Sequence, residues 1–427
     1  MRKMVCISIL LCITLLAAAP AFGNERTTIV MAGWAHPDDM KDVIAEFEAK
    51  HPWIQVEYRY VEGGTLGYTS AVALWAVGGA LPDVLPVPFW SFYDLLEVGA
   101  LAGLNELIER DQDEVNISDY LPGALEAHQR DGVIYGLPGG LELMTILCNN
   151  DLFMEKGLAL PSQEFLQGNW SIETMIDAAR KLTTENPNGR LDTVGVYMET
   201  NQLEFIAPYV WAYGGRIFSD DGFYCLLDSP EALEGIEVLV SLLQEEKAFV
   251  TTAQRGHFKA DWWDALAGGD AGMLSWWISA AELIRAQGIN WQLGLVPFPK
   301  GVTNRTNLIA FHSTGVSSTG AHKDEAWELV KFLAGEATPR SDSTGMFARI
   351  SYMGPWMENM RNYLGVQGVE LIGLAQEAMR SFARPVSAKA TSIVAELLQR
   401  GFLGQLSAPV AVREAVRLAE GVLQEYR

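Results

Sequence analysis

Residues that often carry catalysis are present in this sequence, but their spacing matches no catalytic or metal-binding motif. The histidines form no His-Glu-x-x-His pair, and no Gly-x-Ser-x-Gly segment occurs. Asp261 and Asp264 are a close acidic pair, but glycosidase chemistry depends on the separation of two carboxylates across a substrate, which chain spacing does not determine. The segment 63–67 is rich in glycine but lacks the lysine of a phosphate loop, and we interpret it as a ligand-facing turn. We therefore expect no catalytic residue, no metal ligand and no cofactor.

Aromatic side chains give the stronger signal. The chain contains 13 tryptophans, and several stand where predicted strands or helices end: Trp34, Trp90, Trp211, Trp276 and Trp277. The apolar C–H faces of sugar rings lie flat on aromatic rings, while sugar hydroxyls need carboxylate, amide or indole partners. A single tryptophan is more often a core residue than a sugar platform. Their repeated position after strands favours a binding role for a few of them.

The N-terminus has the pattern of a secretory signal peptide. Arg2 and Lys3 precede an apolar run over 5–19, and the small-residue segment Ala21-Phe22-Gly23 follows. The run is shorter than the roughly 20 residues of a membrane-spanning helix, so we expect cleavage before Asn24 rather than an uncleaved anchor. Cys6 and Cys12 lack the context for lipid attachment. We expect a mature protein that is free in a periplasmic or other extracytoplasmic compartment.

Length and charge exclude further classes. The chain has 427 residues, more than the roughly 250–300 that a single hydrophobic core supports, so two lobes are expected. The formal charge of −22 repels phosphate backbones, which argues against nucleic-acid binding. Cys148 and Cys225 are consistent with one disulfide or with two buried thiols.

Strand-like and helical segments alternate along most of the chain. A strand over 27–32 is followed by a helix after Pro37 with an apolar stripe of Met40, Val43, Ile44 and Phe47, and then by the alternating strand Ile54–Tyr60. Ser171 and Ser229 are typical helix N-caps. The segment from 368 to the C-terminus has a helical pattern throughout. This order predicts an α/β fold in which parallel sheets are flanked by helices.

A fixed order of short motifs resembles the family 1 extracellular solute-binding proteins of bacterial ABC importers, the group that includes maltose-binding proteins. The resemblance covers the mature chain to about residue 360. The motifs are Trp34, Gly79-Ala-Leu-Pro-Asp-Val84, Gly132-Val-Ile-Tyr-Gly-Leu-Pro138, Cys148-Asn-Asn-Asp-Leu-Phe153, Trp211-Ala-Tyr-Gly-Gly215, Gly269-Asp-Ala-Gly-Met273 and Val296-Pro-Phe-Pro299. Cys148 and His312 depart from the family pattern.

The resemblance implies a two-lobe clamp, a periplasmic-binding-protein fold with a helical C-terminus. The first lobe would comprise 24–140 and 300–345, and the second 141–299 and 346–427. The chain would cross between lobes near 139–144, near 296–300 and before the C-terminal helices. The implied ligand-binding residues are Trp34, Phe89, Trp90, Glu142, Trp211, Trp276, Trp277, Phe311 and His312.

The sequence thus predicts a monomeric, non-catalytic subunit that captures a carbohydrate and delivers it to membrane permease subunits. No ATP-binding motif is present, so separate subunits would hydrolyse ATP. Three alternatives are left open. One is an anionic ligand, such as a glycerol phosphate or uronate, paired with Arg216, Arg255 or Arg305. The others are a sensor that docks on a receptor kinase, and a secreted glycan-cleaving enzyme.

Overall fold

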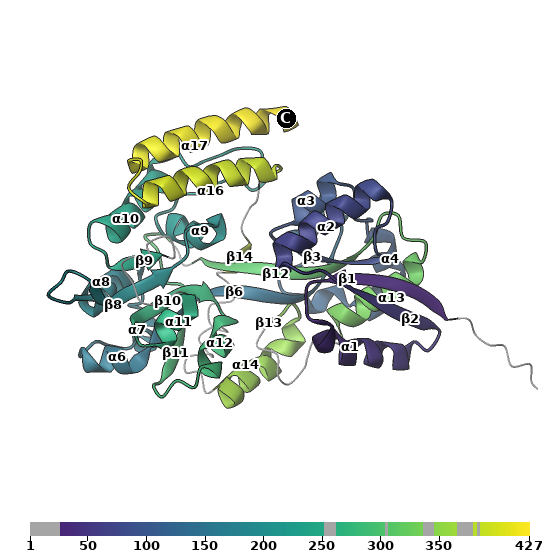
Figure 1. Cartoon of the computed structure of the whole chain (residues 1–427), viewed down its shortest axis with the longest axis horizontal. Helices are drawn as coiled ribbons and strands as arrows, with labels where there is room; N and C mark the ends of the chain where they lie inside the picture. Colours follow the sequence, from purple (N-terminus) through teal and green to yellow (C-terminus); the bar gives the residue numbers. More distant parts are fainter. Residues whose placement is uncertain (1–25, 252–261, 304–305, 336–345, 365–378, 382–384) are drawn as a thin grey trace, which may run out of the picture.

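The computed structural model describes residues 26–251, 262–303, 306–335, 346–364, 379–381 and 385–427. Its elements form two α/β lobes that lie side by side and share long central strands (Figure 1). No helix in these ranges is long and apolar enough to cross a membrane. The predicted signal peptide, Arg255, Asp261 and Arg305 lie outside the described residues.

The first lobe has a parallel core of three strands covered by helices. β1 lies between β2 and β3 and runs parallel to both. The elements of this lobe are β1 (Thr27–Gly33), α1 (Pro37–Lys50), β2 (Ile54–Tyr60), α2 (Gly64–Gly78), β3 (Val84–Pro88), α3 (Phe92–Glu97), α4 (Asn105–Arg110), α5 (Gln112–Val115), β4 (Gln129–Arg130), β5 (Val133–Ile134) and α13 (Lys323–Ala334). The predicted opening of strand, helix and strand is confirmed.

The second lobe has its own parallel core, in which β8 lies between β9 and β10. Its elements are α6 (Asn150–Glu155), α7 (Pro161–Leu166), α8 (Ile172–Leu182), β7 (Thr184–Glu185), β8 (Leu191–Met198), α9 (Leu203–Ala212), α10 (Pro230–Gln244), β9 (Phe249–Thr251), α11 (Trp262–Ala267), β10 (Ala271–Trp277), α12 (Ala280–Ala286), β11 (Leu293–Pro297), α16 (Ala388–Phe402) and α17 (Ala408–Leu423). Ser171 and Ser229 cap α8 and α10 as expected, because each hydroxyl accepts a hydrogen bond from the backbone three residues later, at 3.2 Å.

Two long strands connect the lobes, β6 (Leu137–Asn149) and β12 (Asn307–Val316). β6 pairs with β12 as far as Leu143 and with β10 from Met144 onwards, so both lobes belong to one continuous sheet. Each of these pairings is antiparallel. The described sheet is therefore mixed, with parallel strands in each lobe and antiparallel strands at the crossing.

The structure shifts one of the predicted crossings, the one expected near 296–300. Lys300 forms a bridge with Ser171, and the backbone N–H of Val302 donates to the carbonyl of Ala212, so the chain still contacts the second lobe at 300–302. The second crossing occurs later, within β12. The strand β13 (Met346–Phe347) pairs with the first-lobe part of β6, before the chain enters α14 (Ile350–Leu364).

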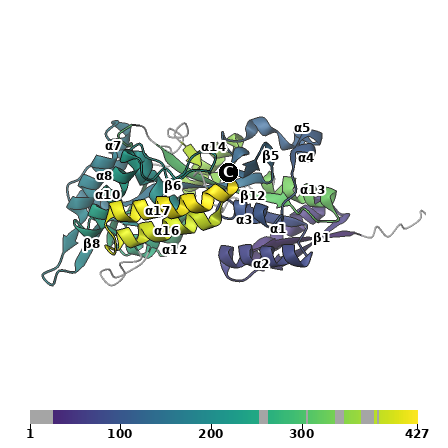
Figure 2. The same ribbon diagram turned by 90° about the horizontal axis from the view of Figure 1, so that it is seen from above.

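The C-terminal segment is mostly helical, as expected. α16 and α17 form an antiparallel pair that packs on α10 and extends along the second lobe (Figure 2). The prediction of helix throughout 368–427 is wrong at β14 (Met379–Ser381), which pairs with Asn307–Ile309 of β12. The predicted glycine turn at 63–67 is also wrong, because the helix α2 begins at Gly64. Gly63 is its N-cap, with the positive φ that glycine adopts readily.

Cys148 and Cys225 are both free and buried, which resolves the alternative left open by the sequence. Burial raises the pKa of the Cys225 thiol to about 12 and also raises that of Cys148. Both residues belong to the apolar core of the second lobe. They are therefore structural residues with little thiolate character.

Candidate functional site

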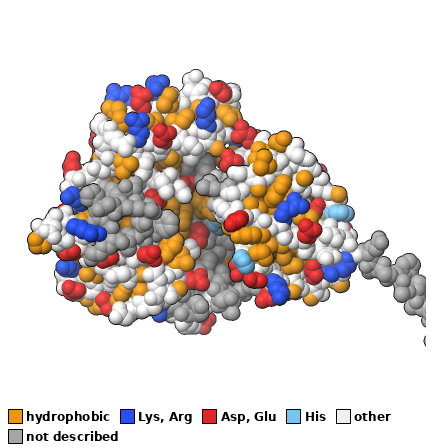
Figure 3. Space-filling model, in the orientation of Figure 1, with side chains coloured by type: hydrophobic (Ala, Val, Ile, Leu, Met, Phe, Trp, Pro, Cys, Tyr) orange, Lys and Arg blue, Asp and Glu red, His pale blue; other side chains and the backbone are white. Residues whose placement is uncertain are grey.

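A hollow separates the two lobes, and hydrophobic side chains lie along its walls (Figure 3). Parallel strands deliver their carboxyl ends to this region, which is where open α/β sheets bind ligands. Trp34 follows β1, Phe89 and Trp90 follow β3, and Trp277 is the last residue of β10. All four side chains are partly buried rather than enclosed in a core.

These rings form a continuous series, here called the aromatic row, that passes from the first lobe to the second. The row consists of Trp34, Trp90, Phe89, Trp277, Phe205 and Trp276, with successive ring centroids separated by 6.4, 4.8, 5.7, 5.6 and 4.6 Å. The contact of 5.7 Å between Phe89 and Trp277 joins the lobes. An apolar face of a ligand placed on the row therefore contacts both lobes at once.

Two histidines in the first lobe are held in the neutral form. The ring of His312 packs against Trp90 and Phe89, at centroid distances of 5.0 and 6.0 Å. Burial lowers the pKa of His312 to about 4. Behind it, Nδ1 of the fully buried His128 lies 2.8 Å from the hydroxyl of Ser313, and burial lowers the pKa of His128 to about 3. This wall is thus uncharged at neutral pH.

Glu142 is the acidic residue next to the crossing. It lies on β6 opposite Ala310 of β12, and its Oε2 accepts a hydrogen bond of 3.4 Å from the backbone N–H of Ser279. Ser279 follows β10, so this contact also links the lobes. Burial raises the pKa of Glu142 to about 7 because the hydrogen bonds from Ser279 offset only part of the desolvation cost. Near neutral pH, Glu142 is therefore present partly as the carboxylate, which only accepts hydrogen bonds, and partly as the protonated carboxyl, which can also donate one.

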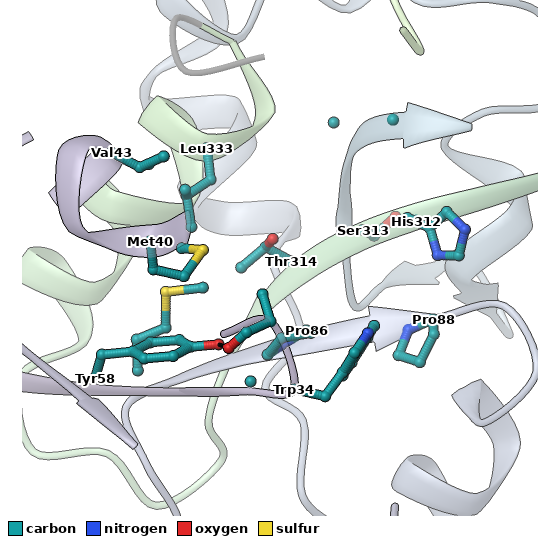
Figure 4. Close-up of a pocket in the computed structure, with 15 residues that line it drawn as sticks. Trp34, Met40, Val43, Tyr58, Pro86, Pro88, His312, Ser313, Thr314 and Leu333 are labelled. Carbon is teal, nitrogen blue, oxygen red and sulfur yellow. Dashed lines mark hydrogen bonds between the residues drawn. The ribbon is translucent and has the colours of Figure 1, made fainter. Parts of the chain in front are cut away.

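A cavity of about 350 Å³ opens beside the aromatic row on the first lobe (Figure 4). Its lining, among the described residues, contains no Asp, Glu, Lys or Arg, and its single histidine is His312. Trp34, Pro88 and His312 form one end, and Met40, Val43 and Leu333 form the other, with Thr314 between them. The position, size and lining are typical of a small-molecule site.

The predicted site residues divide into two groups. The structure brings together Trp34, Phe89, Trp90, Trp276, Trp277 and His312 in or against the aromatic row, with Glu142 near the end of β10. Phe311 is completely buried in the apolar core, because neighbouring residues of a strand point to opposite faces and His312 takes the side toward Trp90. Its expected ligand contact is therefore not supported. Trp211 is 9% exposed within the second-lobe core, so little of its ring can meet a ligand in this conformation.

Sequence reasoning missed the residues that complete the site. Phe205 links Trp276 to Trp277 from α9. It is 3% exposed, so it supports the two tryptophan rings from the second-lobe core rather than offering a face to a ligand. Met40 and Val43 were assigned to the core face of α1 together with Phe47. Only Phe47 of that stripe is fully buried, whereas Met40 and Val43 line the cavity.

Solved structures with the same architecture cover almost the entire chain. The ABC substrate-binding protein from Listeria monocytogenes in complex with cycloalternan is 20% identical, with a TM-score of 0.77 over 93% of this chain and 99% of that one. The sugar-binding protein MalE from Xanthomonas citri is 17% identical, with a TM-score of 0.74 over 94% of this chain and 98% of that one. At these identities the likeness shows the fold.

Sequence comparisons identify the family. The galactooligosaccharide-binding protein of Bacillus subtilis strain 168 is 24% identical over 310 residues, which span 71% of this chain and 67% of that protein. The family model for bacterial extracellular solute-binding proteins matches residues 33–338. With its two-lobe fold and a cleft at the strand ends, the chain belongs to the bacterial extracellular solute-binding protein family.

Proposed function

We propose that this protein is the carbohydrate-binding subunit of an ABC importer. It captures a saccharide between its lobes and delivers it to permease subunits in the membrane. The aromatic row is the observation that carries this proposal, because a sugar ring on Phe89 and Trp277 contacts both lobes together. Ligand binding stabilises a closed state only through such differential contacts. The names of the relatives, which include a galactooligosaccharide-binding protein, support the same ligand class.

The proposal also covers compartment and assembly. The protein acts outside the cytoplasm, in line with its family and with the signal-like N-terminus, from which cleavage would release a chain beginning at Asn24. It works as a monomer, without a cofactor, a metal or a nucleic-acid partner. The expected absence of catalysis accords with its relatives, which are solute-binding proteins.

Two alternatives receive less support. Arg216, one of the cations considered for an anionic ligand, forms an ion pair of 2.8 Å with Asp220, and the described cavity lining contains no Lys or Arg. A glycan-cleaving site needs two carboxyl groups that flank a bond. Asp264 instead accepts a hydrogen bond from the side chain of Gln287, and the described cavity lining contains no carboxylate.

A thermal-shift panel tests the proposed ligand class. Purified mature protein should melt at a higher temperature with at least one mono- or oligosaccharide. A ligand that binds only the folded state adds about 2.7 kcal/mol to the free energy of unfolding at a hundredfold excess over its dissociation constant. Glycerol 3-phosphate and glucuronate serve as anionic comparisons. Stabilisation by these anions alone would refute the carbohydrate assignment.

A further inference from the structure

The cavity beside the aromatic row has two chemically different ends. The end next to the row contains Trp34, Pro88 and His312, as described above. The other end, here called the apolar end, is formed by Met40 and Val43 of α1 and by Leu333 of α13. Figure 4 shows Met40, Val43 and Leu333 gathered on the side away from Trp34 and His312. Flexible thioethers and branched aliphatic groups together make a surface suited to an apolar group.

Few polar atoms are available to a ligand at the apolar end. The hydroxyl of Tyr58 donates a 3.0 Å hydrogen bond to the carbonyl of Ala35. The close approach of this ring depends on Gly33, where a Cβ atom would lie 2.4 Å from the tyrosine oxygen. Thr314 supplies one further hydroxyl between the two ends. An unmodified sugar ring carries several hydroxyls, and each one buried without a partner loses affinity.

The two ends belong to one cavity, so one ligand can occupy both. A saccharide on the aromatic row extends toward Met40 and Val43 only with a group that needs no hydrogen-bond partners. We propose that the preferred ligand is a saccharide that carries an alkyl or aryl substituent, and that this substituent occupies the apolar end. This inference rests on the proposed carbohydrate-binding function and specifies which saccharides the site selects.

Calorimetric titration of matched ligand pairs tests the inference. The probes are maltose, cellobiose and lactose, each compared with its p-nitrophenyl glycoside. For at least one pair, the glycoside should bind the native protein at least tenfold more tightly than the free disaccharide, because burial of the aryl group removes apolar surface from water. Equal affinities within every pair that binds would overturn the inference but leave the proposed function intact. If a saccharide of the thermal-shift panel binds but no glycoside does, the inference alone fails. If no saccharide and no glycoside binds, the proposed function fails, and the inference fails with it.

Variants that fill the apolar end test whether the aryl group of the preferred glycoside binds there. Val43→Phe and Leu333→Phe enter the cavity from two different helices, and both native side chains are only partly buried, so a larger ring is tolerated. In each variant, the ratio of the glycoside affinity to the free-disaccharide affinity should fall to less than threefold. Ile44→Phe is the matched control, because Ile44 is a partly buried neighbour on α1 that does not line the cavity. A glycoside preference that persists in both filled variants would assign the aryl group to another surface.

Discussion

Replacement of Trp277 by alanine is expected to weaken saccharide binding by at least tenfold. Trp277 is the second-lobe partner of the contact that joins the lobes, 5.7 Å from Phe89. Its removal deletes a stacking face that contributes roughly 0.5 to 1.5 kcal/mol beyond the burial of area, and it also deletes part of the contact that favours closure. Calorimetric titration with a saccharide identified by the panel measures the loss.

The control for this substitution is the same change at a buried tryptophan. Trp170 is 1% exposed, and its indole N–H donates a 2.9 Å hydrogen bond to the carbonyl of Pro297. Trp170→Ala should lower the melting temperature strongly, because truncation of a buried tryptophan costs about 3 to 5 kcal/mol, while the folded fraction should bind as the native protein does. Trp211→Ala is expected to resemble this control more than Trp277→Ala. If Trp277→Ala binds the saccharide with native affinity, the aromatic row is not part of the binding site.

The second large effect is a pH dependence that originates at Glu142. Its pKa of about 7 means that the carboxylate form, which accepts hydrogen bonds from sugar hydroxyls, grows as the pH rises through neutrality. If only this form accepts the ligand, affinity should increase by about tenfold between pH 6 and pH 8. Titrations across this range should show the increase in the native protein and a flat profile in Glu142→Gln. Parallel profiles in the two proteins would contradict the assignment.

The same residue should affect stability with the opposite sign. Its pKa is about 7 in the folded chain and 4.5 in the reference state, so the folded protein binds more protons between these values. The free energy of unfolding therefore falls as the pH rises from about 4.5 through 7, by up to about 3 kcal/mol from this group. The difference between the native protein and Glu142→Gln isolates this contribution, because other carboxylates titrate alike in both. Denaturation curves at several pH values measure it.

Local signals in the sequence were sufficient for much of the fold. Ser171 and its apolar stripe identify α8, and the alternation in Ile54–Tyr60 identifies β2, because capping and side-chain period are properties of short segments. The shared strand β6 was not predicted as a single element. It includes Pro138, Gly139 and Gly140, which are typical of a turn, and only its pairing with β12, β13, β10 and β11 extends it through both lobes.

The part of the site that could be predicted from the sequence is the part made of an uncommon residue type, tryptophan. Trp34, Trp90 and Trp277 were identified because tryptophans recur where predicted strands end, and their rings can pack on sugar faces. Phe311 and His312 were expected to act together, but the period of two in β12 separates them onto opposite faces. Met40 and Val43 follow the same helical spacing as true core residues. They line the cavity because of the way α1 packs near α13 and β12. This tertiary arrangement cannot be predicted from a local sequence pattern.

The central claim is that the lobes close on a saccharide, and small-angle scattering tests it most directly. The radius of gyration of the mature protein should decrease at a saturating concentration of a saccharide from the panel, because contacts to both lobes favour the closed state. Trp277→Ala at the same concentration should close to a smaller extent. Scattering curves of the native protein that coincide with and without saturating saccharide would contradict the account.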